Sequence, residues 1–297
     1  MLQAGVQEKS RLAFAALLTG AVGIAFAPIL VRLSEVGPSA TAFYRVFLAL
    51  PALWLWRARE RRQPDAPAQP AGSKDRRQLA MTGLLFAGDL ALWHWSIRLT
   101  SVANATLFAN FAPIFVTLGA RILISERITP RFLLGMTLAL AGAAMVVGNS
   151  LRVTAEHVAG DLVGLATAVF YAGYMLGVKL LRRSFSTATI MAWSGLSASP
   201  ALFLVALASG ERLLPTHASG WTVVVALALI SQLGGQSLIA YAFAHLPASF
   251  SSLSLLLQPA LAACLAWIIL AEPLGVVQAC GGAVILAGIA VAGRAAR

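Results

Sequence analysis

The chain has 297 residues, of which 59% are hydrophobic and only 11% are charged. This composition excludes an ordinary soluble domain, in which about a quarter of the residues are charged, and predicts that much of the surface faces lipid. A formal net charge of +11 could suit nucleic acid, but almost all basic residues lie in short segments between apolar runs. We therefore predict a polytopic membrane protein without a nucleic-acid partner.

Ten apolar runs of roughly 18 to 22 residues match the length of a helix that crosses a hydrocarbon core of about 30 Å. The backbone needs internal hydrogen-bond partners in lipid, and the period-2 alternation of a β-barrel is absent, so helices are expected. The predicted fold class is an all-α membrane protein with ten transmembrane helices. These spans are 12–32, 39–56, 79–98, 101–120, 132–149, 161–180, 187–208, 221–242, 249–270 and 274–293.

The basic residues predict the orientation of the chain. If the N-terminus is cytoplasmic, 17 lysines and arginines fall on the inner side and four on the outer side, while Arg45 lies within a span. Cytoplasmic connections are enriched in lysine and arginine, so both termini are expected inside. The longest polar segment, 57–78, has three prolines and seven basic residues, and it is predicted to be a flexible cytoplasmic linker.

An internal duplication is indicated by four landmarks that recur 146 residues apart. Pro113, Glu126, Gly135 and Gly142 correspond to Pro259, Glu272, Gly281 and Gly288. We therefore expect two domains, 1–150 with the linker 57–78, and 151–297. Each holds five spans, an odd number, so the second lies upside down relative to the first. Inverted repeats are typical of secondary transporters, which bind substrate near the midplane between the halves.

Ten spans as five plus five, the repeated proline-to-glutamate pair and the glycine-bearing last span of each half together resemble the drug/metabolite transporter superfamily, in its EamA-domain branch. Within that branch the chain looks most like the YddG-type amino-acid exporters of bacterial inner membranes. The resemblance implies a central cavity between the halves and export of small metabolites such as aromatic amino acids. It also implies a multi-pass protein of the bacterial inner membrane.

Charged groups inside the predicted spans are candidates for coupling. Asp89 is the only acidic residue deep within a span, where a carboxylate costs about 2.5 to 3.5 kcal/mol, so it should face the bundle interior. Arg45 is its candidate partner, because the two lie at similar depths from the outer ends of their helices. His94 is a candidate proton carrier, although it is equally typical of an interfacial aromatic belt together with Trp93 and Trp95. A structural ion pair and a role in handling substrate or protons both stay open.

Polar and aromatic residues at helical spacing predict the lining of the cavity. In lipid such stripes face protein or a cavity, and hydrogen bonding between helices is the alternative explanation. Aromatic and amide groups together would suit a flat, amphipathic substrate. The candidate substrate-binding residues are Trp93, Thr106, Asn110, Tyr171, Tyr174, Gln232 and Gln236.

The repeated landmarks have structural interpretations as well. Pro113 and Pro259 remove helical hydrogen bonds, so they either fix a bend or act as hinges. Glu126 and Glu272 follow a span and are expected to cap or pair locally. The glycines seven residues apart in the last span of each half share one face, which allows close approach to a neighbouring helix.

Sequence motifs of enzymes, metal sites and cofactor sites are absent, so neither catalysis nor a cofactor is expected. Cys264 and Cys280 fall in spans and should pack as small apolar residues. The predicted function is export of small amphipathic metabolites, amino acids first of all, by alternating access. The alternatives are a drug or other metabolite exporter on the same scaffold and, from a different class, a passive channel. Proton coupling and oligomeric state stay open.

Overall fold

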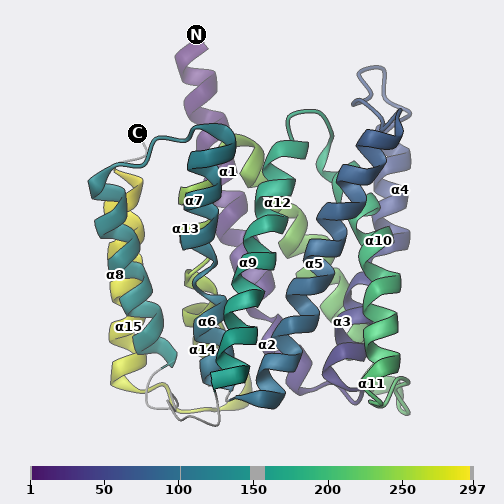
Figure 1. Ribbon diagram of the computed structural model, residues 1–297, viewed down its shortest axis with the longest axis vertical. Coiled ribbons are helices and arrows are strands. Elements are labelled where there is room, and N and C mark those ends of the chain that lie inside the picture. The colour runs from purple at the N-terminus through teal and green to yellow at the C-terminus, as the bar shows by residue number, and fades with distance from the viewer. Residues whose placement is uncertain (1, 101, 148–157, 295–297) are drawn as a thin grey trace.

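The computed structural model describes residues 2–100, 102–147 and 158–294, and within these ranges it consists of helices and connecting segments, without strands (Figure 1). The helices are α1 (Leu2–Ala25), α2 (Ala27–Arg32), α3 (Pro38–Phe47), α4 (Leu50–Glu60), α5 (Ser73–Leu99), α6 (Val102–Ala109), α7 (Ala112–Ile124), α8 (Pro130–Val147), α9 (Val158–Leu181), α10 (Thr187–Ala208), α11 (Ala218–Ala226), the π-helix η3 (Leu227–Gln236), α12 (Ser237–His245), α13 (Ala248–Ser254), α14 (Leu257–Leu270) and α15 (Val276–Gly293).

Eight helical segments among the described residues are long and apolar enough to cross a membrane. The helices at 38–60 and 73–99, which cover the second and third predicted spans, do not belong to this set. Both carry charged residues at the ends that adjoin the 57–78 segment, and α5 also contains Asp89, so their apolar stretches are shorter. The all-α class is confirmed, whereas the number ten stays a prediction.

Four of the predicted spans are each divided into two helices. In every case a proline stands in the first turn of the second helix, at Pro28, Pro51, Pro113 or Pro259. Proline lacks an N–H group and its ring clashes with the carbonyl four residues earlier, so the helix before it ends, while the first turn of a new helix tolerates it. The interruptions expected at Pro113 and Pro259 are present, and movement at these points stays a prediction.

The duplication is visible in the backbone. The helices α6 and α13 begin at Val102 and Ala248, 146 residues apart, and α7 and α14 end at Ile124 and Leu270, again 146 residues apart. The same offset relates both ends of α8 to both ends of α15. A two-repeat fold therefore fits the described structure.

The last helices of the two repeats, α8 and α15, pack against each other more extensively than any other pair and lie side by side at one edge of the bundle (Figure 1). A Cβ atom on Gly142 would lie 2.7 Å from the carbonyl oxygen of Gly281, and one on Gly135 would lie 2.6 Å from that of Gly288. The predicted glycine faces therefore meet each other across the two repeats, which confirms that they serve helix packing.

One segment departs from the expected α-helical geometry. The eighth predicted span is continuous from Ala218 to His245, but its centre, Leu227–Gln236, is a π-helix. A π-helix closes hydrogen bonds over five residues instead of four, so its turn is wider than that of an α-helix. Gln232 and Gln236 both lie in this segment, less than one of its turns apart.

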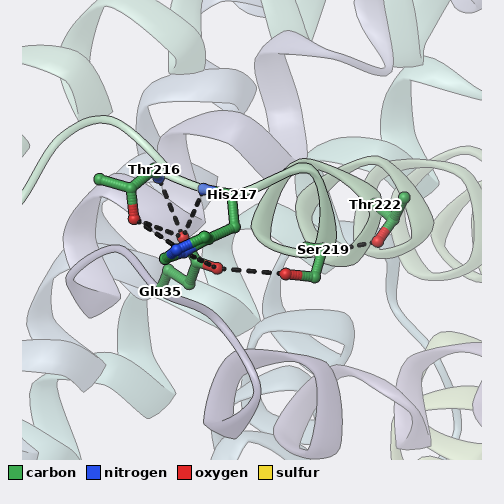
Figure 2. A network of polar contacts seen from close by, with 5 residues as sticks. All are labelled: Glu35, Thr216, His217, Ser219 and Thr222. Atoms are coloured by element: carbon green, nitrogen blue, oxygen red, sulfur yellow. Dashed lines mark hydrogen bonds and ion pairs between the residues drawn. The ribbon is translucent and has the colours of Figure 1, made fainter.

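Both termini lie at the same end of the bundle (Figure 1). At the opposite end the connection between α2 and α3 is bound to that between α10 and α11, as Figure 2 shows around Glu35. The Glu35 carboxylate accepts hydrogen bonds from the backbone N–H groups of Thr216 (2.9 Å) and His217 (3.1 Å) and from the hydroxyl of Ser219 (3.3 Å). This network joins the two repeats.

The charge of Glu35 is stable across the neutral range. Desolvation acts to raise the pKa of Glu35, but hydrogen bonds from the backbone of His217 and Thr216 outweigh it and lower the pKa to about 2. Since a carboxylate with a lowered pKa stabilises the fold above its unfolded pKa, this contribution is lost only in acid, as the pH falls toward about 2. The connection is therefore not expected to open between pH 5 and 8.

Candidate functional site

A cavity of about 210 Å³ lies inside the bundle, between the two repeats. Helices α1, α2, α3, α5 and α6 of the first repeat line it, together with α9, η3 and α14 of the second. Part of its lining comes from the last turn of α1 and from α2, α3 and α6, which lie in the half of the bundle away from the termini (Figure 1). The cavity therefore occupies the middle of the bundle and this half. The broken helices α6/α7 and α13/α14 both pass it at their interruptions.

The structure brings most of the predicted site residues to this one cavity. Those that line it are Arg45, Asp89, Trp93, Thr106, Asn110, Tyr171, Gln236 and Pro259. Tyr174 and Gln232 are each 2% exposed and lie behind the lining, while Pro113 is buried outside it. The side chain of His94 lies outside the described part of the chain.

Two oppositely charged side chains face the cavity, and each is only 9% exposed. Arg45 donates from Nε to Oε1 of Gln232 (3.2 Å), and its guanidinium lies 5.9 Å from the centre of the Phe86 ring. Among the described residues Asp89 has neither a hydrogen bond nor an ion pair within 4 Å. The direct contact expected between Arg45 and Asp89 is therefore not formed, although the two side chains are near enough to interact electrostatically.

Aromatic rings form one wall of the cavity. Tyr171 lines it and stacks on Tyr174 with ring centres 6.3 Å apart, and Tyr174 stacks in turn on Phe86 at 4.6 Å. The Tyr174 hydroxyl accepts a hydrogen bond from Nε2 of Gln236 (3.2 Å). Tyr174 therefore holds Tyr171, Phe86 and Gln236 in place rather than facing the cavity itself.

Among the polar and aromatic residues of the lining, Phe86, Thr167 and Gln258 were not named as site candidates. Gln258 directly precedes Pro259 at the start of α14, and its amide lies near the Tyr171 hydroxyl. Its Nε2 is buried without a hydrogen bond of normal geometry, as is Nδ2 of Asn110 near the start of α7. The two amides thus stand at the interruptions of equivalent helices. The repeated proline could have indicated Gln258, since in inverted-repeat transporters the residues next to an interruption of a helix lie near the substrate site at the midplane.

A second hollow of about 700 Å³ lies between α5, α7 and α9, toward the end of the bundle that carries the termini. Its rim includes Lys74 and Arg77, and its walls include Leu85 and Leu176. None of the predicted site residues lines it, and although helices of both repeats form it, it is displaced from the middle of the bundle toward that end. The smaller cavity is therefore the candidate substrate site.

Curated proteins similar to this chain are transporters. A probable terminal-alkyne amino-acid exporter of Streptantibioticus cattleyicolor is 31% identical over 73% of this chain and 74% of its own length. An uncharacterized transporter of Archaeoglobus fulgidus is 29% identical over 61% of this chain, and the pseudopaline exporter CntI of Pseudomonas aeruginosa is 26% identical over 56%. These last two matches span only 62% and 57% of the relatives' own lengths.

A protein of known crystal structure shares the fold, with a TM-score of 0.78 over 98% of this chain and 99% of its own, at 20% identity. The model of the EamA-like transporter family matches residues 11–148 and 158–294, which is nearly the whole chain. With its helical bundle, its long apolar helices and its cavity between two repeats, this multi-pass membrane protein belongs to the EamA-like transporter family.

Proposed function

We propose that the protein exports small amphipathic metabolites, amino acids first of all, across the bacterial inner membrane by alternating access. The observation that carries this proposal is the presence of Arg45 and Asp89 in one cavity, both nine-tenths buried and not paired with each other. A zwitterion offers a carboxylate to the arginine and an ammonium group to the aspartate. Binding it would neutralise both buried charges at once.

The size and walls of the cavity favour an amino acid over a drug. Its volume of about 210 Å³ is below the range of roughly 300 to 1,000 Å³ that is typical of sites for drug-sized ligands. Phe86, Trp93 and Tyr171 present aromatic surface beside the charges, which suits an apolar or aromatic side chain. The similarity to a probable amino-acid exporter points the same way.

Alternating access is favoured over a passive channel by the difference between the two ends of the bundle. The cavity lies in the half away from the termini, while at the other end α7 packs against α13. A channel would need a continuous path, whereas a cavity that extends from the midplane toward one end is what an alternating carrier presents in one of its two states.

The proposed topology has ten spans, with the termini and the 57–78 linker in the cytoplasm. To test it, single cysteines are placed at Gly72 and at Leu214 in a variant lacking Cys264 and Cys280. The cysteine at Leu214 should react with an impermeant maleimide added to intact cells, whereas that at Gly72 should react only after permeabilisation. Reaction of both in intact cells would reject the ten-span orientation.

Efflux from proteoliposomes tests the function and the division of roles within the cavity. Labelled tryptophan and threonine should both leave in a saturable manner and exchange with unlabelled amino acid on the other side. Replacing Trp93 or Tyr171 by alanine should slow tryptophan several-fold more than threonine, because lost stacking is worth about 0.5 to 1.5 kcal/mol. Replacing Asn110 or Gln236 by leucine should slow both alike, since a lost hydrogen bond to a shared backbone group does not depend on the side chain.

The control variant for this experiment is Leu214→Ala, which lies in an exposed connection far from the cavity. If neither amino acid moves while another amphipathic compound does, the amino-acid assignment is wrong. If flux is linear in concentration and shows no exchange, the passive channel is the better description.

A further inference from the structure

Glu126 and Glu272 stand at equivalent positions of the two repeats, in the same local backbone. Each follows a residue in the left-handed conformation, Ser125 or Ala271, both with φ of 54°. Each also donates its backbone N–H to the carbonyl six residues earlier, Ala120 at 3.1 Å or Ala266 at 3.4 Å. The two repeats thus present a glutamate at the end of α7 and at the end of α14 in the same way.

The partners of the two carboxylates differ. Glu126 reaches into the other repeat and accepts hydrogen bonds from the backbone N–H groups of Ala248 (3.0 Å) and Ser249 (3.1 Å) and from the Ser249 hydroxyl. Ala248 and Ser249 form the first turn of α13, so Glu126 caps that helix. An ionised carboxylate at a helix N-terminus also interacts favourably with the helix dipole.

Within the described part of the chain, Glu272 makes no equivalent contact. The helix equivalent to α13 is α6, which begins at Val102, but Glu272 instead pairs with Arg32 at the end of α2 (2.6 Å). Arg32 is the only partner of this carboxylate among the described residues, and the two side chains are 60% and 44% exposed. Exposed ion pairs contribute little to stability, so Glu272 is easily released.

The packing of the helices follows the same asymmetry. At the end of the bundle that carries the termini, α7 packs against α13, whereas the equivalent pair at the other end, α14 and α6, makes no comparable contact. The cavity extends toward that second end. The end with the capping glutamate is therefore the closed one.

We infer that Glu126 and Glu272 are alternative helix caps that determine which end of the transporter is closed. In the state described, Glu126 caps α13 and closes the cytoplasmic end. In the opposite state Glu272 leaves Arg32 and caps the first turn of α6, while Glu126 releases α13, so that the cavity opens to the cytoplasm. The inference rests on the proposed alternating access, and it does not depend on which substrate is carried.

The test uses two reporter cysteines at equivalent positions, Thr106→Cys and Ser252→Cys, each in a variant lacking Cys264 and Cys280. Thr106 lines the cavity, whereas Ser252 is 1% exposed beneath the closed end. In vesicles of known orientation, an impermeant maleimide should react with the first from outside and hardly at all with the second from inside. Both rates are then measured in Glu126→Gln and in Glu272→Gln.

Opposite effects are expected. Glu126→Gln should raise the maleimide reaction rate of Ser252→Cys from inside about tenfold and lower that of Thr106→Cys. The neutral amide accepts the hydrogen bonds from α13 more weakly than the carboxylate does, so only the closed cytoplasmic end is destabilised. Glu272→Gln should keep Ser252→Cys protected and raise the reaction of Thr106→Cys. The double variant should return both rates toward those of the parent, since each state then loses its own cap.

Glu60→Gln is the matched control. Glu60 also links the two repeats at the cytoplasmic end, by accepting a hydrogen bond from the hydroxyl of Ser186 (2.6 Å). The residue 146 positions later is Ala206, which has no carboxylate, so this link has no counterpart at the opposite end. It should leave the ratio of the two rates unchanged. The inference is overturned if both glutamate variants shift the reporters in the same direction, or if the double variant is further from the parent than either single one, as general destabilisation would produce.

The outcome also separates this inference from the proposed function. If both reporters react rapidly from their own sides in the parent protein, alternating access itself is wrong. If the reporters respond to the glutamate variants as expected but no amino acid is transported, only the substrate assignment falls.

Discussion

Neutralising Asp89 as Asp89→Asn is expected to slow amino-acid efflux by about 100-fold or more, since leaving one buried charge without its counterpart costs about 3 to 5 kcal/mol. Arg45→Gln should have an effect of similar size. Both side chains are nine-tenths buried on one cavity, and neither is neutralised by a direct ion pair. The substrate is therefore expected to supply the missing charge of each.

Substrates that carry only one charge distinguish this role from a structural one. In Asp89→Asn, the efflux of a carboxylic acid without an amino group should slow much less than that of the amino acid. Such an acid has no ammonium group that could bind Asp89. In Arg45→Gln, the efflux of an amine without a carboxylate should stay close to its rate in the parent protein, because such an amine has no carboxylate that could bind Arg45. Gln232→Leu is the control, since it removes the hydrogen bond to Arg45 Nε but leaves both charges in place.

The same variants test the remaining interpretations. A structural ion pair predicts that all substrates are slowed alike and that the double variant Asp89→Asn/Arg45→Gln is better folded than either single variant. A proton-carrying aspartate predicts that Asp89→Asn keeps exchange between the two sides but loses its dependence on pH. If every substrate keeps its parental rate in both single variants, the cavity is not the transport site.

Replacing Gly281 by alanine is expected to destabilise the protein by about 1 to 3 kcal/mol, as extra atoms do in a well-packed interior. An added Cβ would lie 2.7 Å from the carbonyl oxygen of Gly142 and 2.8 Å from the backbone nitrogen of Val146. Both contacts are with backbone, so only separation of α8 and α15 relieves them. Replacing Gly281 by leucine should prevent this pair from packing and leave little folded protein.

The next residue along the helix is the matched control. A Cβ on Gly282 would meet the Ala260 side chain at 3.6 Å, an ordinary van der Waals contact. Because alanine favours a helix by about 1 kcal/mol over glycine, Gly282→Ala should be neutral or stabilising. Thermal unfolding of the purified variants in detergent measures the difference, and equal midpoints for the two would show that the glycine contact between α8 and α15 is unimportant.

Length, composition and the 146-residue offset predict the helical class, the membrane location and the duplication. These properties follow from the sequence because each depends on local composition or on a pattern repeated along the chain. The glycine spacing likewise predicted a packing face, since residues seven apart lie on one side of a helix in any surroundings. Most of the polar residues that line the cavity could be named for the same reason, because polar side chains in an apolar helix must face the interior.

Pairing between helices could not be predicted in this way. The sequence places Arg45 and Asp89 at similar depths, but only the packing of α3 against η3 brings Gln232 close enough to bind the arginine. The π-helix at Leu227–Gln236 has no local signal either, because the surrounding helices decide whether a wider turn is accommodated. Gln258 was missed although it directly precedes the repeated Pro259, because only the packed bundle shows that its amide reaches the cavity.

The sequence by itself therefore determined that two equivalent halves exist, that they are helical and lie in a membrane, and which faces of their helices are polar. Only the tertiary structure decided how the two halves differ. Equivalent glutamates, Glu126 and Glu272, have the same backbone and different partners, because α7 packs against α13 whereas α14 makes no comparable contact with α6. That choice depends on contacts between residues more than 100 positions apart, whose free energies are set by packing rather than by any local sequence pattern.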